Sequence, residues 1–132
     1  MPTVRPFPPV NAPKPTTKAA GDAAEALALA HLERHQLRLV QRNYRTPGRG
    51  GGEIDLIMRT PDGTLVFVEV RQRTSGSHGG AAASVSVAKQ RRIVFAARFF
   101  LSRLGTVPPC RFDVVTVQAA EVNWLQGAFE AY

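Results

Sequence analysis

Two short apolar segments of the chain each carry a carboxylate where β-strands usually carry hydrocarbon. Residues 52–57 (GEIDLI) hold Asp55, and residues 66–71 (VFVEVR) hold Glu69. The stretch 60–64 (TPDGT) between them predicts a tight hairpin turn, because proline presets the first turn position and glycine accepts a positive φ. If the two threonines of this turn pair, Asp55 falls directly opposite Glu69. Like charges across a ladder are destabilising, so a positive group, typically a metal ion, is expected between them.

The same register places Glu53 opposite Arg71, and two interpretations of this acidic cluster stay open. In one, Arg71 neutralises Glu53 and bridges the other two acids in a structural ion-pair cluster. In the other, Asp55, Glu69 and the carbonyl oxygen of Val70 supply hard oxygen ligands to Mg²⁺ or Mn²⁺. Such an ion activates a bound water and neutralises charge on a phosphodiester. An acidic pair in a basic chain favours phosphodiester chemistry.

The rest of the chain supplies the elements that must position these acids. The predicted elements are a helix over 18–36, a strand over 37–44, a glycine-rich loop over 46–52, a hairpin over 53–73, a second loop over 74–83, a helix from Ser84 or Ser86 to Leu104 stopped by Gly105, and strands over 111–117 and 122–129. The fold class is therefore α/β with the order α-β-β-β-α-β-β. Residues 18–132 are expected to form one domain, after a disordered Pro-rich tail at 1–17 that holds six of the ten prolines.

Both predicted helices have an apolar face. The inner face of the first is small, since it consists of Ala20, Ala23, Ala24, Leu27, Ala30 and His31. The inner face of the second consists of Ile93, Val94, Ala97, Phe100, Leu101 and Leu104. Phe95 and Phe99 fall outside this second arc among arginines, where they can stack on bases, contact a dimer partner or pack under the C-terminal segment.

Composition bounds the class of protein. The 132 residues allow one domain with a hydrophobic core but not two. No apolar run approaches the roughly 20 residues of a membrane span, and the N-terminus lacks a signal-peptide core. A single cysteine, Cys110, excludes an internal disulfide and is expected to be a buried structural thiol. We therefore expect a cytoplasmic protein that does not bind membranes.

The chain is strongly basic, with a formal charge of +7. Residues 76–110 alone contribute five cations and no acid. A basic domain favours a polyanionic partner, most often nucleic acid, although a solvated basic helix face is the simpler alternative. The predicted nucleic-acid contacts are Lys89, Arg92, Arg103, Arg42 and Arg73.

The paired motifs GEIDLI and VFVEVR resemble the active-site hairpin of the PD-(D/E)XK nuclease superfamily. The chain resembles more closely the small bacterial YraN-like family, which is itself similar to archaeal Holliday-junction resolvases. Further matching segments are Gly21-Asp22-Ala23-Ala24-Glu25, Arg42-Asn43-Tyr44, Lys89 and Arg111-Phe112-Asp113-Val114-Val115. The resemblance implies a restriction-endonuclease-like fold, with a mixed central sheet flanked by helices. It also implies a Mg²⁺-dependent endonuclease that acts on structured or branched DNA.

Carried over by position, the resemblance makes Asp55 and Glu69 the metal-binding carboxylates. It implies that Glu25 completes the site, although without the resemblance Glu25 would be interpreted as an acid on the helix surface. It also implies that Lys89 contacts a phosphate. Superfamily nucleases usually place lysine two residues after the glutamate, where this chain has Arg71. Arginine stays charged and can donate hydrogen bonds to two oxygens at once. Arg71 can therefore bind the scissile phosphate but is a poor proton acceptor.

Three functions follow from these observations. The first is a metal-dependent endonuclease whose catalytic residues are Asp55, Glu69, Arg71 and Glu25. The second is a nucleic-acid-binding module that does not cleave. The third is a protein-interaction domain, for which a homodimer through the exposed phenylalanines is one form.

Overall fold

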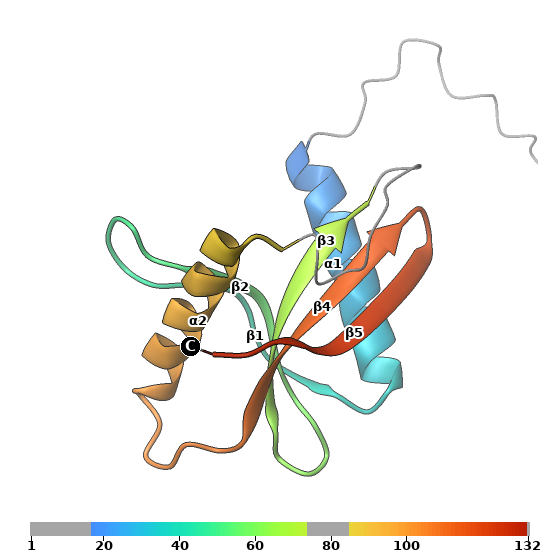
Figure 1. Cartoon of the computed structure of the whole chain (residues 1–132). Helices are drawn as coiled ribbons and strands as arrows, with labels where there is room; N and C mark the ends of the chain where they lie inside the picture. The colour runs from blue at the N-terminus through green and yellow to red at the C-terminus, as the bar shows by residue number, and fades with distance from the viewer. Residues whose placement is uncertain (1–16, 74–84, 132) are drawn as a thin grey trace, which may run out of the picture.

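The computed structural model describes residues 17–73 and 85–131, which form a five-stranded sheet and two helices (Figure 1). The elements are α1 (Thr17–Arg34), β1 (Arg38–Arg45), β2 (Glu53–Arg59), β3 (Leu65–Gln72), α2 (Val87–Leu101), β4 (Cys110–Gln118) and β5 (Glu121–Phe129). This confirms the predicted α/β class and element order. The predicted tail lies outside the described residues except for Thr17, which begins α1, and the predicted loop over 74–83 lies outside them entirely.

The sheet has the strand order β1-β2-β3-β4-β5. It is mixed, as predicted, because β3 and β4 are parallel while the other neighbours are antiparallel. Parallel neighbours need a crossover connection, and α2 lies in the one between β3 and β4. The predicted hairpin register is confirmed from Arg59 opposite Leu65 to Leu56 opposite Val68.

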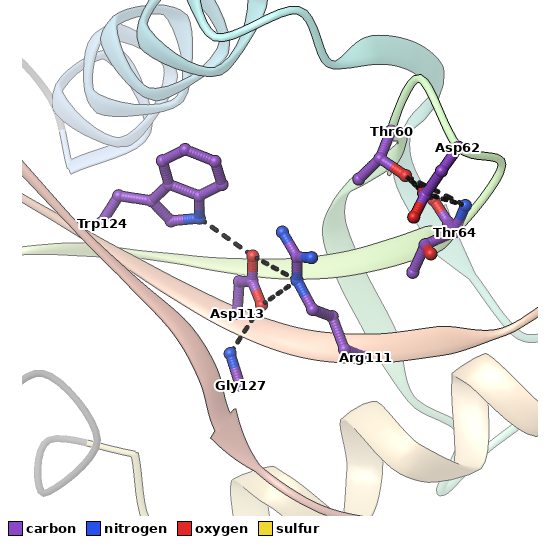
Figure 2. Close-up of polar contacts among 7 residues, drawn as sticks. All are labelled: Thr60, Asp62, Thr64, Arg111, Asp113, Trp124 and Gly127. Atoms are coloured by element: carbon purple, nitrogen blue, oxygen red, sulfur yellow. Dashed lines mark hydrogen bonds and ion pairs between the residues drawn. The ribbon is translucent and has the colours of Figure 1, made fainter.

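The turn of this hairpin is fixed by its own side chains (Figure 2). The Thr60 amide donates to the Thr64 carbonyl at 2.9 Å, which closes the loop as the sequence predicts. Asp62 accepts hydrogen bonds from the Thr60 hydroxyl and, at 3.2 Å, from the Thr64 amide. The Thr60 hydrogen bond, followed by that from Thr64, lowers the pKa of Asp62. The turn thereby sets the register that carries Asp55 and Glu69 to the far end of the hairpin.

Helix α1 covers one face of the sheet through Ala24, Ala28 and Leu32, which are buried. These residues pack in one cluster with inward side chains of β2, β3 and β4. The expected small inner face is confirmed, but the predicted stripe is rotated, because Leu27 is 39% exposed. An alanine-rich helix has little contrast between its faces, so periodicity alone could not choose the buried one.

Helix α2 covers the opposite face, with Ile93, Val94 and Ala97 buried as predicted. Phe99 is partly buried against the same cluster, so it is a packing residue. Phe95 is 53% exposed. Of the two phenylalanines outside the apolar arc, only Phe95 presents a large apolar surface.

The ends of α2 differ in how well the sequence predicts them. Ser86 caps the N-terminus, since its hydroxyl accepts from the Lys89 amide at 3.1 Å. The predicted C-terminal end at Leu104 is wrong, because the helix ends at Leu101 with Ser102 as its C-cap. Leu104 still packs on the core, from a tight turn whose amide donates to the Leu101 carbonyl at 3.0 Å. The apolar period therefore continues past the helix.

The expectation of a buried Cys110 is wrong, because this thiol is exposed at the first position of β4. The neighbouring β3 residue Leu65 is fully buried, so the core starts beside Cys110 rather than under it. Within residues 17–73 and 85–131, neither helix combines the length and apolar character needed to cross a membrane.

Candidate functional site

The two strand carboxylates lie directly beyond the last pair of the β2–β3 ladder. That pair is Leu56 and Val68, and the ladder does not extend to Asp55 and Glu69. Instead, Asp55 Oδ2 accepts a hydrogen bond from the Val70 amide at 2.8 Å. The side chain of Asp55 thus replaces a backbone contact and holds the two strand ends together. Glu69 is only 4% exposed, and its backbone lies opposite Val114 of the parallel neighbour β4.

Buried carboxylate oxygens at this site lack partners. Glu69 Oε2 and Glu25 Oε1 are both buried and accept no hydrogen bond from any described residue. A buried polar atom without a partner costs about 1–3 kcal/mol, and more when it is charged. These two oxygens come from different elements, and both carboxyl groups lie close enough to Asp55 for its charge to raise their pKa.

The pKa values of the three carboxyl groups at this site are all raised, which agrees with the shortage of partners there. Burial, and secondly the charge of Asp55, raises the pKa of Glu69 to about 7, although Lys89 and Arg71 oppose the shift. Burial also raises the pKa of Asp55, against the Val70 hydrogen bond, which lowers it. Burial and then Asp55 raise the pKa of Glu25. The three carboxylates therefore resist being ionised together, and a divalent cation would relieve this cost.

The nearby cations leave the acids only partly neutralised. Lys89 Nζ lies 3.8 Å from Glu69 Oε1, which is long for a charge-assisted hydrogen bond. Glu53 pairs with Arg45 at 3.0 Å rather than with Arg71, because the β2–β3 ladder stops before that position. Among the described residues, Arg71 forms no ion pair. This arrangement disfavours the closed cluster in which Arg71 neutralises Glu53 and bridges the other acids.

Asn43 is a site residue to which the sequence reasoning assigned no role. The β1–β2 register pairs Arg42 with Leu56 and Tyr44 with Ile54, so Asn43 lies across from Asp55. Its φ of 50° is in the left-handed region, which a residue within a strand rarely adopts. Asparagine tolerates this conformation better than most residues. The available signal was the Arg42-Asn43-Tyr44 segment of the family resemblance.

Asp55 lines a pocket of about 350 Å³ that opens to solvent, which we call the acidic pocket; Glu69 is not part of its lining. Its charged lining has four carboxylates and two cations: Asp22, Glu25, Glu53, Asp55, Lys18 and Arg45. Gly21 of α1 and Asn43 of β1 complete the wall. The structure thus brings Glu25 of α1 to the same pocket as Asp55 of β2, two residues that are 30 positions apart in the sequence.

The predicted basic residues are not all at this site. Lys89 contacts Glu69, and Arg42 lies close enough to Glu25 to lower its pKa, against the net upward shift. Arg92 lines a neighbouring pocket. Arg103 follows the C-terminus of α2, roughly 20 Å along the helix axis from Lys89. Arg73 follows β3, and neither it nor Arg103 lines the acidic pocket or its neighbour.

The donor set suits a hard cation that keeps part of its hydration shell. Within the described ranges, no three His, Cys, Asp or Glu side chains converge closely enough to enclose a metal ion. That excludes a fully protein-ligated cage of these side chains there. Mg²⁺ usually binds through one or two carboxylates and completes its sphere with water and phosphate. Asp55 and Glu69 are two carboxylates that meet this requirement, and one buried oxygen of Glu25 has no described partner.

A different buried carboxylate shows what a structural acid looks like in this protein (Figure 2). Asp113 is fully buried and accepts from Arg111 Nε at 3.1 and 3.2 Å. It also accepts from Trp124 Nε1 and from the Gly127 amide, both at 2.9 Å. The Gly127 contact spans the irregular register between β4 and β5. Both oxygens of Asp113 are satisfied, whereas one oxygen of Glu69 is not.

The fold and site together define an α/β protein with a carboxylate-lined pocket at the end of a central hairpin. The chain belongs to the Uncharacterised protein family UPF0102, whose model matches residues 24–117. The matched segment contains Glu25, Asp55 and Glu69. The predicted membership of a small bacterial family is thus confirmed, while the similarity to resolvases stays a prediction.

Several curated bacterial proteins are similar over most of the chain. A UPF0102 protein of Albidiferax ferrireducens is 72% identical over 116 residues, which cover 88% of this chain and 91% of that protein. A UPF0102 protein of an Acidovorax species is 62% identical over 121 residues, or 92% of each chain. One from Methylibium petroleiphilum is 59% identical over 119 residues, which cover 88% of this chain and 98% of that protein.

Proposed function

We propose that this protein is a metal-dependent nuclease that hydrolyses a phosphodiester at the acidic pocket. The main support for this proposal is the environment of Glu69. This carboxylate is 4% exposed, has one unpartnered oxygen and lies beside a second carboxylate. A buried charge of this kind is expensive in a purely structural role. It is ordinary in a site whose charge is balanced by a bound cation.

Asp55 and Glu69 would hold Mg²⁺ or Mn²⁺, with the Val70 carbonyl as a third oxygen donor, and Glu25, which lines the acidic pocket together with Asp55, would orient water. When bound, the ion supplies Lewis-acid neutralisation of the phosphate and a more acidic water. The Val70 amide keeps Asp55 in place through its 2.8 Å hydrogen bond. The positive charges of Lys89 and Arg71 both act on Glu69 and oppose the rise of its pKa. Both side chains are suited to bind phosphate oxygens when a substrate is present.

The substrate follows from charge and from the motif. A formal charge of +7 favours a nucleic acid, and similarity to resolvases suggests structured or branched DNA. Arg71 also favours a second candidate function, a nucleic-acid-binding module without cleavage, because arginine cannot act as the proton acceptor that a lysine can be. That candidate keeps the pockets and the basic residues but not the hydrolytic step.

The test is a cleavage panel with duplex, single-stranded, flap and four-way-junction DNA in Mg²⁺, Mn²⁺ or EDTA. We expect metal-dependent cleavage that Asp55→Asn and Glu69→Gln each reduce by at least about a hundredfold. Glu121→Gln, an exposed carboxylate at the start of β5, is the matched control and should retain activity. Cleavage that is unaffected by both site variants would refute the assignment.

A fourth variant separates the two candidate functions. Arg71→Lys restores the usual residue of the superfamily hairpin. Cleavage gained by Arg71→Lys, in a chain that otherwise only binds, would establish the second candidate and a decayed catalytic site. Equal or lower activity of Arg71→Lys in a cleaving protein would show that the arginine belongs to the working site.

A further inference from the structure

A second pocket adjoins the acidic pocket at the Arg45–Glu53 ion pair, since both residues line both pockets. Its volume is about 370 Å³, and it lies between the glycine-rich loop 46–52 and α2. Lys89 and Arg92 of α2 join Arg45, so three cations face one carboxylate. We call this the basic pocket. The two pockets therefore have opposite charge and share one wall.

The loop that forms the other wall is fixed at its base. Thr46 Oγ1 accepts from the Gly52 amide at 2.8 Å, and the Thr46 amide donates to the Gly52 carbonyl at 3.0 Å. A Cβ atom at Gly52 would lie 1.9 Å from the carbonyl oxygen of Arg92, so only glycine lets the loop rest against α2 here. The described loop thus holds the pocket open before any ligand arrives, which lowers the entropic cost of binding.

Two cations of the basic pocket, Arg92 and Arg45, are available to a ligand. The Arg92 side chain forms no hydrogen bond or ion pair with any described residue, and it is exposed. The side chains of the Arg45–Glu53 pair are 76% and 45% exposed, and exposed ion pairs contribute little to stability because water screens them. A phosphate group can displace Glu53 from Arg45 at little cost, because guanidinium binds phosphate in a bidentate manner.

We propose that the basic pocket binds a backbone phosphate of one nucleic-acid strand, next to the phosphodiester held at the acidic pocket. This inference rests on the proposed function, because the latter places the reacting phosphodiester in the acidic pocket. Arg45 and Arg92 bind the phosphate oxygens. Gly48 and Gly50 have open space where a Cβ would be, which leaves room for the sugar that carries the phosphate.

The test measures binding without cleavage. The full chain with Asp55→Asn is titrated in EDTA against a short fluorescein-labelled single-stranded DNA, and the anisotropy is followed at several salt concentrations. Adding Arg92→Glu should weaken binding by about tenfold or more and lower the salt slope by about one. The matched control is Arg59→Glu, the same charge reversal at the exposed far end of β2, which should change binding by less than about threefold. Arg92→Gln, with a melting curve, checks that the loss does not come from unfolding.

The outcomes separate the pocket from the nuclease. Equal losses for Arg92→Glu and Arg59→Glu would overturn the pocket, even if the native protein cleaves DNA. A selective Arg92 effect in a protein that cleaves no substrate would support the pocket and refute the nuclease. Inorganic phosphate at constant ionic strength is the competing probe. Displacement of the DNA by phosphate at a concentration similar to that of the strand would mean a free-phosphate site and would overturn the assignment to a strand.

Discussion

Replacing the buried acid Glu69 with glutamine should make the metal-free protein more stable at alkaline pH. The pKa of Glu69 is raised from 4.5 to about 7 in the folded state. Between these two values the folded state binds more protons than the unfolded state, so the free energy of unfolding falls as pH rises and then levels off above about pH 7. The glutamine variant has no such proton to lose.

The magnitude follows from the size of the shift. A pKa displaced by about 2.5 units corresponds to roughly 3 kcal/mol at about pH 8, and to less than about 1 kcal/mol at about pH 5. Glu69→Gln should therefore exceed the native chain by about 3 kcal/mol in unfolding free energy at the higher pH. The difference should nearly vanish at the lower pH. For a chain of this length, 3 kcal/mol corresponds to roughly 10 °C in melting temperature.

Urea unfolding in EDTA measures this difference, with the single Trp124 as the fluorescence probe. Trp124 packs at the edge of the α1 cluster, so its emission reports loss of the core. Asp113→Asn is the matched control, a buried acid whose oxygens are all satisfied, and it should lose about 2–4 kcal/mol. If Glu69→Gln is no more stable than the native chain at about pH 8, then Lys89 and Arg71 already neutralise Glu69. That result would refute the argument that Glu69 needs a bound cation.

Three further predictions concern the metal, the strand opposite the site and the loop. Mg²⁺ affinity, measured by calorimetry, should rise between about pH 6 and pH 8, with proton release, because the metal competes with the raised pKa of Glu69; affinity independent of pH would contradict this. Asn43→Ala should destabilise the fold by about 1 kcal/mol more than Asn43→Gly in urea unfolding, since φ at this position is 50°; the reverse order, which is usual in strands, would count against strain there. Gly52→Ala should lower the free energy of unfolding by about 1–3 kcal/mol, because the added Cβ would overlap the Arg92 carbonyl oxygen. Gly21→Ala, in the open surface of α1, should instead be neutral or stabilising by up to about 1 kcal/mol, and similar losses for both would show that the loop does not rest on α2.

The hairpin shows how much of the strand pairing the local sequence predicts. Proline and glycine in the turn predict both the loop and the register, and the observed pairs from Arg59–Leu65 to Leu56–Val68 follow that register. The extension to Glu53 and Arg71 fails because the β2–β3 ladder ends at the Leu56–Val68 pair. There the Asp55 side chain takes the Val70 amide, and Glu53 turns to Arg45 on the other neighbouring strand. The choice between two possible partners depends on where the ladder ends, which turn chemistry does not encode.

The errors at Cys110, α1 and the end of α2 have a related origin. At Cys110 and in α1 the error concerns which of several chemically similar positions is covered, and coverage depends on where another element lies. Leu104 keeps the apolar period of α2 although the helix has ended, because a tight turn can present the same side chain to the core. Periodicity reports which side chains face inward, and it does not report the backbone conformation that achieves this.

The sequence by itself determined the element order, the hairpin, the family and the acids that mark the candidate site, because turn residues, alternation and motif spacing act over short distances along the chain. Only the tertiary structure decided that Asn43 lies across from Asp55, and it brought Glu25, which the family resemblance implied, to the same pocket. They come from a helix and a strand that meet the hairpin through packing and β-ladder pairing. It also decided that Glu69 keeps one oxygen unpartnered while Asp113 keeps none. Burial and the supply of hydrogen-bond donors are properties of a three-dimensional neighbourhood, so two carboxylates on adjacent strands can differ in this way although both carry the same ionisable group.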